Sequence, residues 1–198
     1  MIDWEKDLSP VARERLSRIG ELTREERERI KDSEQVDSLL SEFYQGQLEA
    51  EGLWKKLKKE GQASLLQEAQ MKMIDSLNLR ISPAEFRRRK DGILAIETLK
   101  GEQNTSAVEL NLNLMAKLRE RYEAEIEQAY NNVRSEVEKN PQLRLKQVQQ
   151  GQDAVIVQLT IEEAIQQVPQ WKEFLSDHEK RYSQEFANVV EGLKRELK

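Results

Sequence analysis

The side chain best suited to acid–base or metal chemistry in this chain is its single histidine, His178. A histidine-based metal site needs two or more such ligands, and a di-iron bundle needs a Glu-x-x-His pair, whereas Leu175 stands three residues before His178. His178 lies between Phe174 and Tyr182 in a row of apolar residues at helical spacing. We interpret it as a packed or half-exposed histidine with one hydrogen bond, and a pH-sensitive contact is the alternative.

Carboxylates are abundant, but no two of them stand out as an acid–base pair. Such a pair needs environments that separate two pKa values, and Glu123, Glu125 and Glu127 have the pattern of a solvated helix face. The chain has no cysteine, no glycine-rich phosphate loop and no Gly-x-Ser-x-Gly or Walker motif. We therefore assign no catalytic, cofactor-binding or metal-binding residue. We expect a protein that is not an enzyme and has no cofactor and no small-molecule substrate.

Four consecutive cations, Arg87, Arg88, Arg89 and Lys90, form the densest basic cluster. Their place in the first turn of a predicted helix sets them against the helix dipole, which disfavours positive charge there. Consecutive residues spread around a helix, so the four cannot all face one phosphate backbone. We interpret the cluster as a solvated face paired with acidic residues of neighbouring helices. Contact with RNA, DNA or an acidic protein is the alternative.

A second group of cations surrounds Trp54 and comprises Lys55, Lys56, Lys58 and Lys59. The pattern is similar to a helix on a membrane surface, but it lasts only two turns. The preferred interpretation is a buried tryptophan with lysine stems packed over it. These lysines are also candidate partner or nucleic-acid contacts.

Composition favours helices with narrow apolar faces, because charged residues make up 35% and apolar residues 37% of the 198 residues. The net charge of −5 gives no reason to expect nucleic acid as a default partner. The absence of cysteine fits a reducing compartment. Without a signal-peptide pattern or an apolar run of roughly 20 residues, the sequence predicts a soluble cytoplasmic protein with no transmembrane segment.

Helix signals fill most of the chain. Capping-box patterns begin at Thr23, Ser82, Ser106 and Thr160. The sequence predicts a short helix from Ser9 to Gly20 and a second helix that opens at the Thr23 capping box, has regular apolar residues from Val36 and runs to Gly61. Near Gly46 and Gly52 we expect a bend or a close helix–helix approach. Further helices are predicted over 65–78 and 83–101.

Two long apolar stripes predict two long amphipathic helices, over 107–139 and from Trp171 to Leu197. The first stripe comprises Leu112, Met115, Leu118, Tyr122, Ile126, Ala129, Val133 and Val137. The second comprises Trp171, Phe174, His178, Tyr182, Phe186, Val189, Leu193 and Leu197. Large aromatic residues contribute most to burial, so the second stripe is predicted to be an essential part of the core.

The pattern changes between these two helices. Leu143, Leu145 and Val148 predict a short helical piece that ends at Gly151. The β-branched run 154–159 predicts an extended segment, and since one strand cannot satisfy its own backbone, we expect it to be buried against helices or paired across a dimer interface.

The segment Gly151-Gln152-Asp153-Ala154-Val155, followed by Trp171 and Tyr182 on a closing helix, resembles a family of short uncharacterised bacterial helical proteins. Members of that family have a Gly-x-x-Gly-x-Ala-Val segment before a closing helix, and this chain lacks the second glycine. The charged start before Leu22 to Glu26 is similar too. The resemblance implies a bacterial cytoplasmic setting and carries no activity.

The sequence thus predicts an all-α fold, an elongated, coiled-coil-like bundle with one extended segment near 154–159. Residues 1–140 are expected to form a charged helical region and residues 141–198 a C-terminal subdomain. Long charged helices with one apolar stripe bury little area in a monomer, and a second chain supplies more. We therefore expect a non-enzymatic interaction or scaffold protein that self-associates as a homodimer. The alternative is a nucleic-acid- or ribosome-associated factor that uses residues 87–90.

Overall fold

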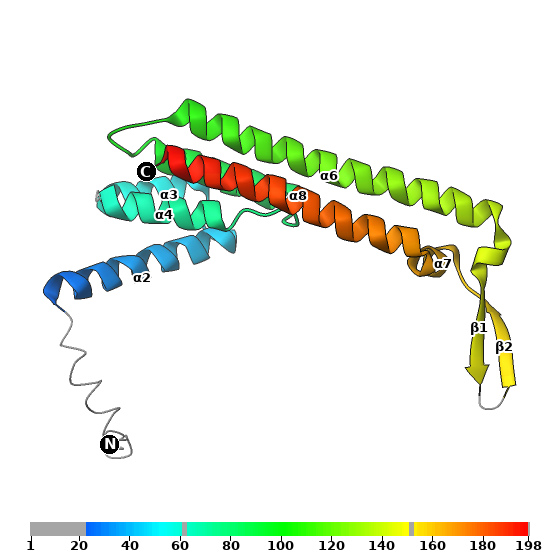
Figure 1. Cartoon of the computed structure of the whole chain (residues 1–198). Helices are drawn as coiled ribbons and strands as arrows, with labels where there is room; N and C mark the ends of the chain where they lie inside the picture. The colour runs from blue at the N-terminus through cyan, green and yellow to red at the C-terminus, as the bar shows by residue number, and fades with distance from the viewer. Residues whose placement is uncertain (1–22, 61–62, 151–152, 198) are drawn as a thin grey trace, which may run out of the picture.

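The computed structural model describes residues 23–60, 63–150 and 153–197. Within them the chain is all-α, with one small two-stranded sheet, so the predicted fold class is confirmed. Figure 1 shows a group of helices at one end and two long antiparallel helices that extend from it. The helix predicted from Ser9 to Gly20 lies outside the described residues.

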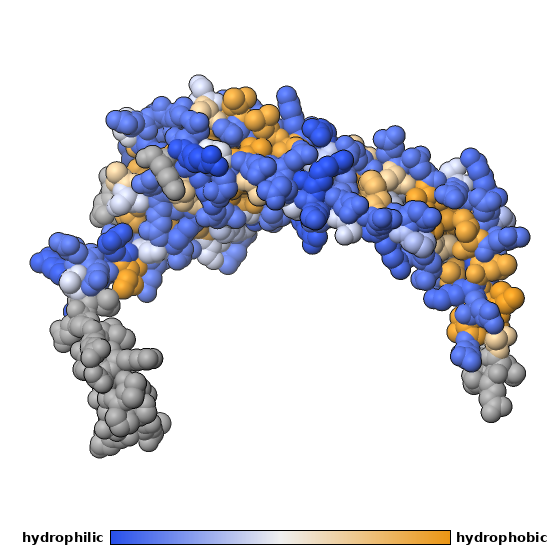
Figure 2. All heavy atoms as spheres, in the orientation of Figure 1, coloured by the Kyte–Doolittle hydropathy of each residue, from blue (hydrophilic) through white to orange (hydrophobic). Residues whose placement is uncertain are grey.

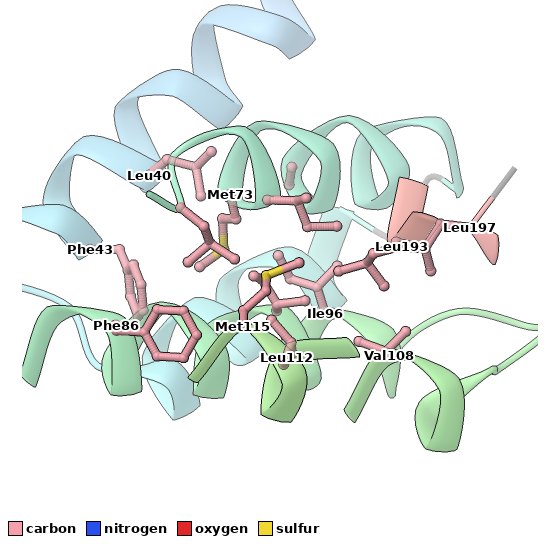
Figure 3. Close-up of a cluster of buried hydrophobic side chains, with 14 of the residues drawn as sticks. Leu40, Phe43, Met73, Phe86, Ile96, Val108, Leu112, Met115, Leu193 and Leu197 are labelled. Atoms are coloured by element: carbon pink, nitrogen blue, oxygen red, sulfur yellow. The ribbon is translucent and has the colours of Figure 1, made fainter. Parts of the chain in front are cut away.

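At one end lies a helical bundle, hereafter the bundle. It contains α2 (Arg24–Tyr44), α3 (Ala50–Glu60), α4 (Ala63–Asp75) and α5 (Pro83–Glu97), together with the start of α6 (Thr105–Lys139) and the end of α8 (Pro169–Glu196). Its core is apolar and joins residues far apart in sequence. Figure 3 shows Leu40 and Met73 on one side of this core and Met115 of α6 on the opposite side, with Leu193 of α8 pointing into it.

The close approach of α5 to α2 and α4 depends on Gly92. A Cβ atom at this position would lie 2.4 Å from Cε of Met73 and 2.8 Å from the ring of Phe43. Because glycine has no side chain, the two neighbours pack directly on the α5 backbone.

Capping explains several helix boundaries. The predicted capping boxes at Thr23, Ser82 and Thr160 are present, each with reciprocal bonds to a glutamate three residues later. The prediction at Ser106 is wrong, because α6 already begins at Thr105 and the carboxylate of Glu97 accepts the backbone N–H of Asn104 instead.

The single helix predicted from the Thr23 capping box to Gly61 is also wrong. The helix ends at Tyr44, the chain turns through Gly46 with φ of 75°, and a separate helix begins at Ala50. Such a positive φ is accessible to glycine at little cost, so the glycine makes a turn rather than a bend.

The two long helices form an extension from the bundle, hereafter the arm. Helices α6 and α8 run antiparallel along it, and both predicted long helices and their stripes are confirmed. A second core cluster lies at its distal end, where Val137, Ala164, Ile165 and Trp171 are buried. The division predicted at 140–141 falls at this distal end. Helix α8 returns from there and shares the bundle core with helices that precede residue 140.

At the distal end the chain passes through a short 3₁₀ helix, Pro141–Arg144, and then forms an antiparallel pair of strands, β1 (Leu145–Gln150) and β2 (Asp153–Gln158). These strands are hereafter the distal hairpin, and α7 (Ile161–Gln167) follows them. The extended segment is confirmed as β2. The helical piece predicted over 143–151 is wrong, because Leu145–Gln150 is the strand that pairs with β2.

Candidate interaction surfaces

Three cations of the basic cluster make contacts inside the bundle. Arg88 donates to the carbonyl of Tyr44, which is the last residue of α2, and Arg89 donates to the carbonyl of Ser76, directly after α4. Lys90 donates to Oδ1 of Asn113 at 2.7 Å. Cations are favourable at helix C-termini, so Arg88 and Arg89 stabilise the ends of two neighbouring helices. The predicted place of the cluster in a first turn is wrong, because α5 begins at Pro83 and these cations follow its first turn. Arg87 is exposed.

Arginines also hold the linker between α4 and α5. Arg119 of α6 is buried and donates to the carbonyls of Leu79 and Ile81, with its guanidinium 4.8 Å from the ring centroid of Phe86. These carbonyls take no part in the hydrogen bonding of a helix, and a buried carbonyl without a hydrogen bond raises the free energy of the folded state. The linker therefore takes its hydrogen bonds from side chains of other elements.

The lysines around Trp54 lie on the outer face of α3. Lys55 pairs with Glu51 and Lys56 with Glu42, each at 2.6 Å, and Nζ of Lys58 lies 4.4 Å above the ring of Trp54. Lys59 is exposed. Trp54 is half-buried, and its indole N–H donates to Oγ1 of Thr98.

Polar groups join α6 and α8 where the arm leaves the bundle, around His178, which is 3% exposed. Its imidazole is stacked between Tyr122 and Phe174. Nε2 lies 3.1 Å from the carbonyl of Tyr122, which can only accept, so Nε2 carries the proton. Nδ1 then accepts from the guanidinium of Arg181 at 3.3 Å. The packed histidine expected from the sequence is found, with a second polar contact in addition.

Two tyrosine–glutamate bonds flank this histidine. The hydroxyl of Tyr122 donates to Glu179 at 2.5 Å, and that of Tyr182 donates to Glu125 at 2.7 Å. Burial and the bond to the Glu179 carboxylate raise the pKa of Tyr122 to about 12. The side chain of Glu125 is 41% exposed, as the predicted solvated face requires, and its carboxylate also binds Arg181 at 2.5 Å. These contacts fix the register of the two helices.

Glu97 is a buried carboxylate that no sequence pattern indicated. It accepts from Nε2 of Gln70 at 2.7 Å and from the backbone N–H of Asn104 at 2.5 Å, and Lys100 lies 3.3 Å away. Burial alone would raise the pKa of Glu97, but the hydrogen bonds from Gln70 and Asn104 outweigh it and lower the pKa. A hollow of about 630 Å³ lies beside this group. Glu97 thus fastens the loop between α5 and α6.

The distal hairpin exposes apolar side chains instead of burying them. Every described side chain of its strands, 145–149 and 154–158, is exposed, and Ile156 is 68% exposed. Figure 2 shows apolar surface at this end of the arm. The expectation that the run 154–159 is buried against helices is therefore wrong for 154–158, and only Leu159 packs against the distal core cluster. Pairing across a dimer interface stays a prediction.

A signal for this hairpin was present in the sequence. Two runs of β-compatible residues, 145–150 and 153–158, are separated by the two residues Gly151 and Gln152. A two-residue connection that begins with glycine is typical of a tight hairpin. The apolar spacing of Leu143, Leu145 and Val148 also fits a helix, and this ambiguity hides the strand that pairs with β2.

In residues 23–60, 63–150 and 153–197, no helix is long and apolar enough to cross a membrane. Over the same residues, no group of three or more His, Asp or Glu side chains is placed to hold a metal ion. No curated protein and no solved structure matches this sequence. The model of one protein family matches residues 51–198, from the first turn of α3 to the end of the chain, and this match includes the whole arm and the distal hairpin. The chain therefore belongs to DUF6657, a family of unknown function.

Proposed function

We propose that this protein is a non-enzymatic interaction or scaffold protein that self-associates through the distal hairpin. The observation that carries the proposal is the exposed apolar surface of this hairpin, held at the far end of the arm. A two-stranded hairpin alone in water is marginally stable, and it needs further strands or a packed helix. The described strands have neither, so a partner that covers them would stabilise them.

The structure of the arm supports a role in holding the distal hairpin away from the bundle. The polar contacts of His178, Tyr122 and Tyr182 join α6 to α8, and Arg80 of the bundle linker binds Glu179 at 2.9 Å. A helical hairpin with a fixed register holds its end at a defined distance and direction from the bundle. The proposal includes a cytoplasmic, bacterial setting, which the cysteine-free sequence and its resemblance to bacterial proteins favour.

Sedimentation velocity over a range of micromolar concentrations tests the proposal. Wild type should sediment faster as concentration rises, whereas a variant with Val148→Thr, Val155→Thr and Val157→Thr should remain monomeric. Threonine keeps the β-propensity of these positions and removes apolar surface. The matched control is Leu110→Thr with Leu114→Thr, which changes another exposed apolar patch on α6 and should associate as wild type does. A wild type that is monomeric throughout would contradict the proposal.

Binding of nucleic acid through residues 87–90 is the alternative. It has less support, because Arg88, Arg89 and Lys90 already bind groups of the bundle. Phosphate contacts are strongest at low salt, so a gel-shift titration with RNA and DNA at low salt tests this alternative. Retardation that is lost in Arg87→Gln would favour it over the scaffold.

A further inference from the structure

We propose that the distal hairpin pairs with a second copy of this chain, β2 against β2, to form a four-stranded antiparallel sheet. This inference rests on the proposed function and adds its geometry: which strand edge is used, in which register, and which residue lies on the two-fold axis.

The register shows which backbone groups of β2 point outward. The N–H of Leu159 donates to the carbonyl of Arg144 at 2.7 Å, next to the pair Leu145 with Gln158. Hydrogen-bonded pairs alternate along an antiparallel ladder, so the bonds to β1 fall at Val157 and Val155. The N–H and C=O groups of Ala154, Ile156 and Gln158 therefore face the free edge of β2.

Charge selects the edge of β2 rather than that of β1. Strand β1 carries Lys146 near its middle, and an edge lysine is a common device against strand pairing. The middle of β2, from Ala154 to Val157, carries no charge and is apolar throughout. Within the described residues the free edge of β2 thus has no partner strand, and no lysine protects it from pairing.

A second copy fits this edge better than a charged partner or a membrane does. The sequence 145–158 has one lysine and one aspartate, so its net charge is zero, although 35% of the residues in the chain are charged. Two copies of the hairpin therefore meet without like-charge repulsion. A bilayer would leave the outward backbone groups of Ile156 without hydrogen bonds, which is costly in hydrocarbon. A second β2 strand satisfies these groups directly.

Two-fold symmetry then limits the register to a few choices, and pairing centred on Ile156, the middle of the three outward-facing residues, overlaps the two strands most. A symmetric antiparallel pair places one residue opposite itself, and outward backbone groups on Ile156 allow its two copies to exchange both hydrogen bonds. This arrangement buries part of the Ile156 side chain, which is 68% exposed in the single chain. Ala154 lies opposite Gln158 of the partner subunit. The resulting sheet has four strands, enough for independent stability when one face is apolar.

Cysteine cross-linking tests this register, because the chain has no cysteine of its own. In a hydrogen-bonded antiparallel pair the Cα atoms lie about 5.5 Å apart, within the range that a disulfide spans. Mild oxidation should convert most of the Ile156→Cys chains into a covalent dimer. The matched control is Gln147→Cys, which lies opposite Ile156 within the hairpin but on the β1 edge, and it should remain largely uncross-linked.

A second pair of variants uses the same two positions. Ile156→Lys should raise the dimer dissociation constant by at least about tenfold, whereas Gln147→Lys should change it little. The interface is smaller than the roughly 800 Å² per partner of a standard complex, so dissociation is expected at micromolar concentrations or above. Circular dichroism of both variants should show that the helices remain folded.

The outcomes separate this inference from the proposed function. If wild type is monomeric at all concentrations, both fail. If wild type associates but Ile156→Lys does so equally and Ile156→Cys does not cross-link, self-association stands and the β2 register is overturned. A monomeric wild type that cosediments with phosphatidylglycerol vesicles would also overturn the inference, in favour of a membrane-binding hairpin.

Discussion

At the scale of single residues, the positions that look chemical in the sequence have structural roles. His178 and Arg89 bind backbone carbonyls, and Glu97 binds a backbone N–H. Residue types identify such groups as unusual, but only the fold shows what they contact. Arg89 lies beyond the first turn of α5, and the carbonyl that it binds directly follows the end of α4.

Arg89→Gln should lower the free energy of unfolding by about 1.5–3 kcal/mol, the usual worth of a hydrogen bond from a charged group. The change removes the bond to Ser76 and the contact with the ring of Tyr44. Urea titration measures the effect. Arg87→Gln is the control in the same cluster and should stay within about 0.5 kcal/mol, because Arg87 is exposed. Equal effects of the two changes would contradict the account.

Glu97→Gln should destabilise the protein at neutral pH by about 1–3 kcal/mol, because an amide there sets an N–H donor against the donors of Gln70 or Asn104. The pKa of Glu97 is lowered by folding, so its contribution is present above the unfolded value of 4.5 and is lost as pH falls through the lower folded value.

Stability curves of wild type and Glu97→Gln should therefore differ by a constant amount at neutral pH and converge only below pH 4.5. Glu102→Gln is the control, since Glu102 is exposed in the same loop. A difference between wild type and Glu97→Gln that is the same at pH 3 and pH 7 would show that the ionised carboxylate is not what matters.

At the scale of elements, the sequence was informative where periodicity is long. The stripes of α6 and α8 extend over several turns, so their helices and buried faces were predicted correctly. Capping boxes located the starts of α2, α5 and α7. The predictions are wrong where the sequence patterns are short, because a few apolar residues fit the spacing of a helix and that of a strand equally well. The turn at Gly46 was predicted as a bend in a helix, and β1 was predicted as helical.

The sequence also does not show which other parts of the chain a given segment contacts. The run 154–159 was correctly predicted to be extended, but its exposure depends on where the arm places it. No local pattern encodes that position, because it follows from the length of α6 and the return of α8. Likewise, the contacts of Glu97 with Gln70 and Asn104 join residues from separate elements, which single-sequence patterns do not reveal.

Phe186→Ala should lower the free energy of unfolding by about 3–5 kcal/mol, because Phe186 is 4% exposed and joins α8 to the bundle core. A thermal melt measures the change. Leu110→Ala on α6 removes an exposed side chain and should stay within about 0.5 kcal/mol. A melting temperature of Phe186→Ala within one degree of wild type would mean that the stripe is not packed.

At the scale of the whole molecule, the bundle holds a long arm whose far end is the least protected part of the described chain. Core residues lie in the bundle and along the helix pair, whereas the hairpin contributes exposed valines and isoleucine. An exposed strand edge invites pairing, and natural proteins either protect such edges or use them. The arm separates this edge from the bundle, so two bundles joined through their hairpins would lie far apart.

Amide hydrogen exchange of wild type at low and high micromolar concentration tests self-association through the hairpin most directly. The amides of Ala154, Ile156 and Gln158 face the free edge of β2, so they should exchange rapidly in the single chain. The account predicts that their exchange slows as concentration rises, while exchange in the buried helices of the bundle stays the same. Hairpin amides that exchange at the same rate at every concentration would contradict it.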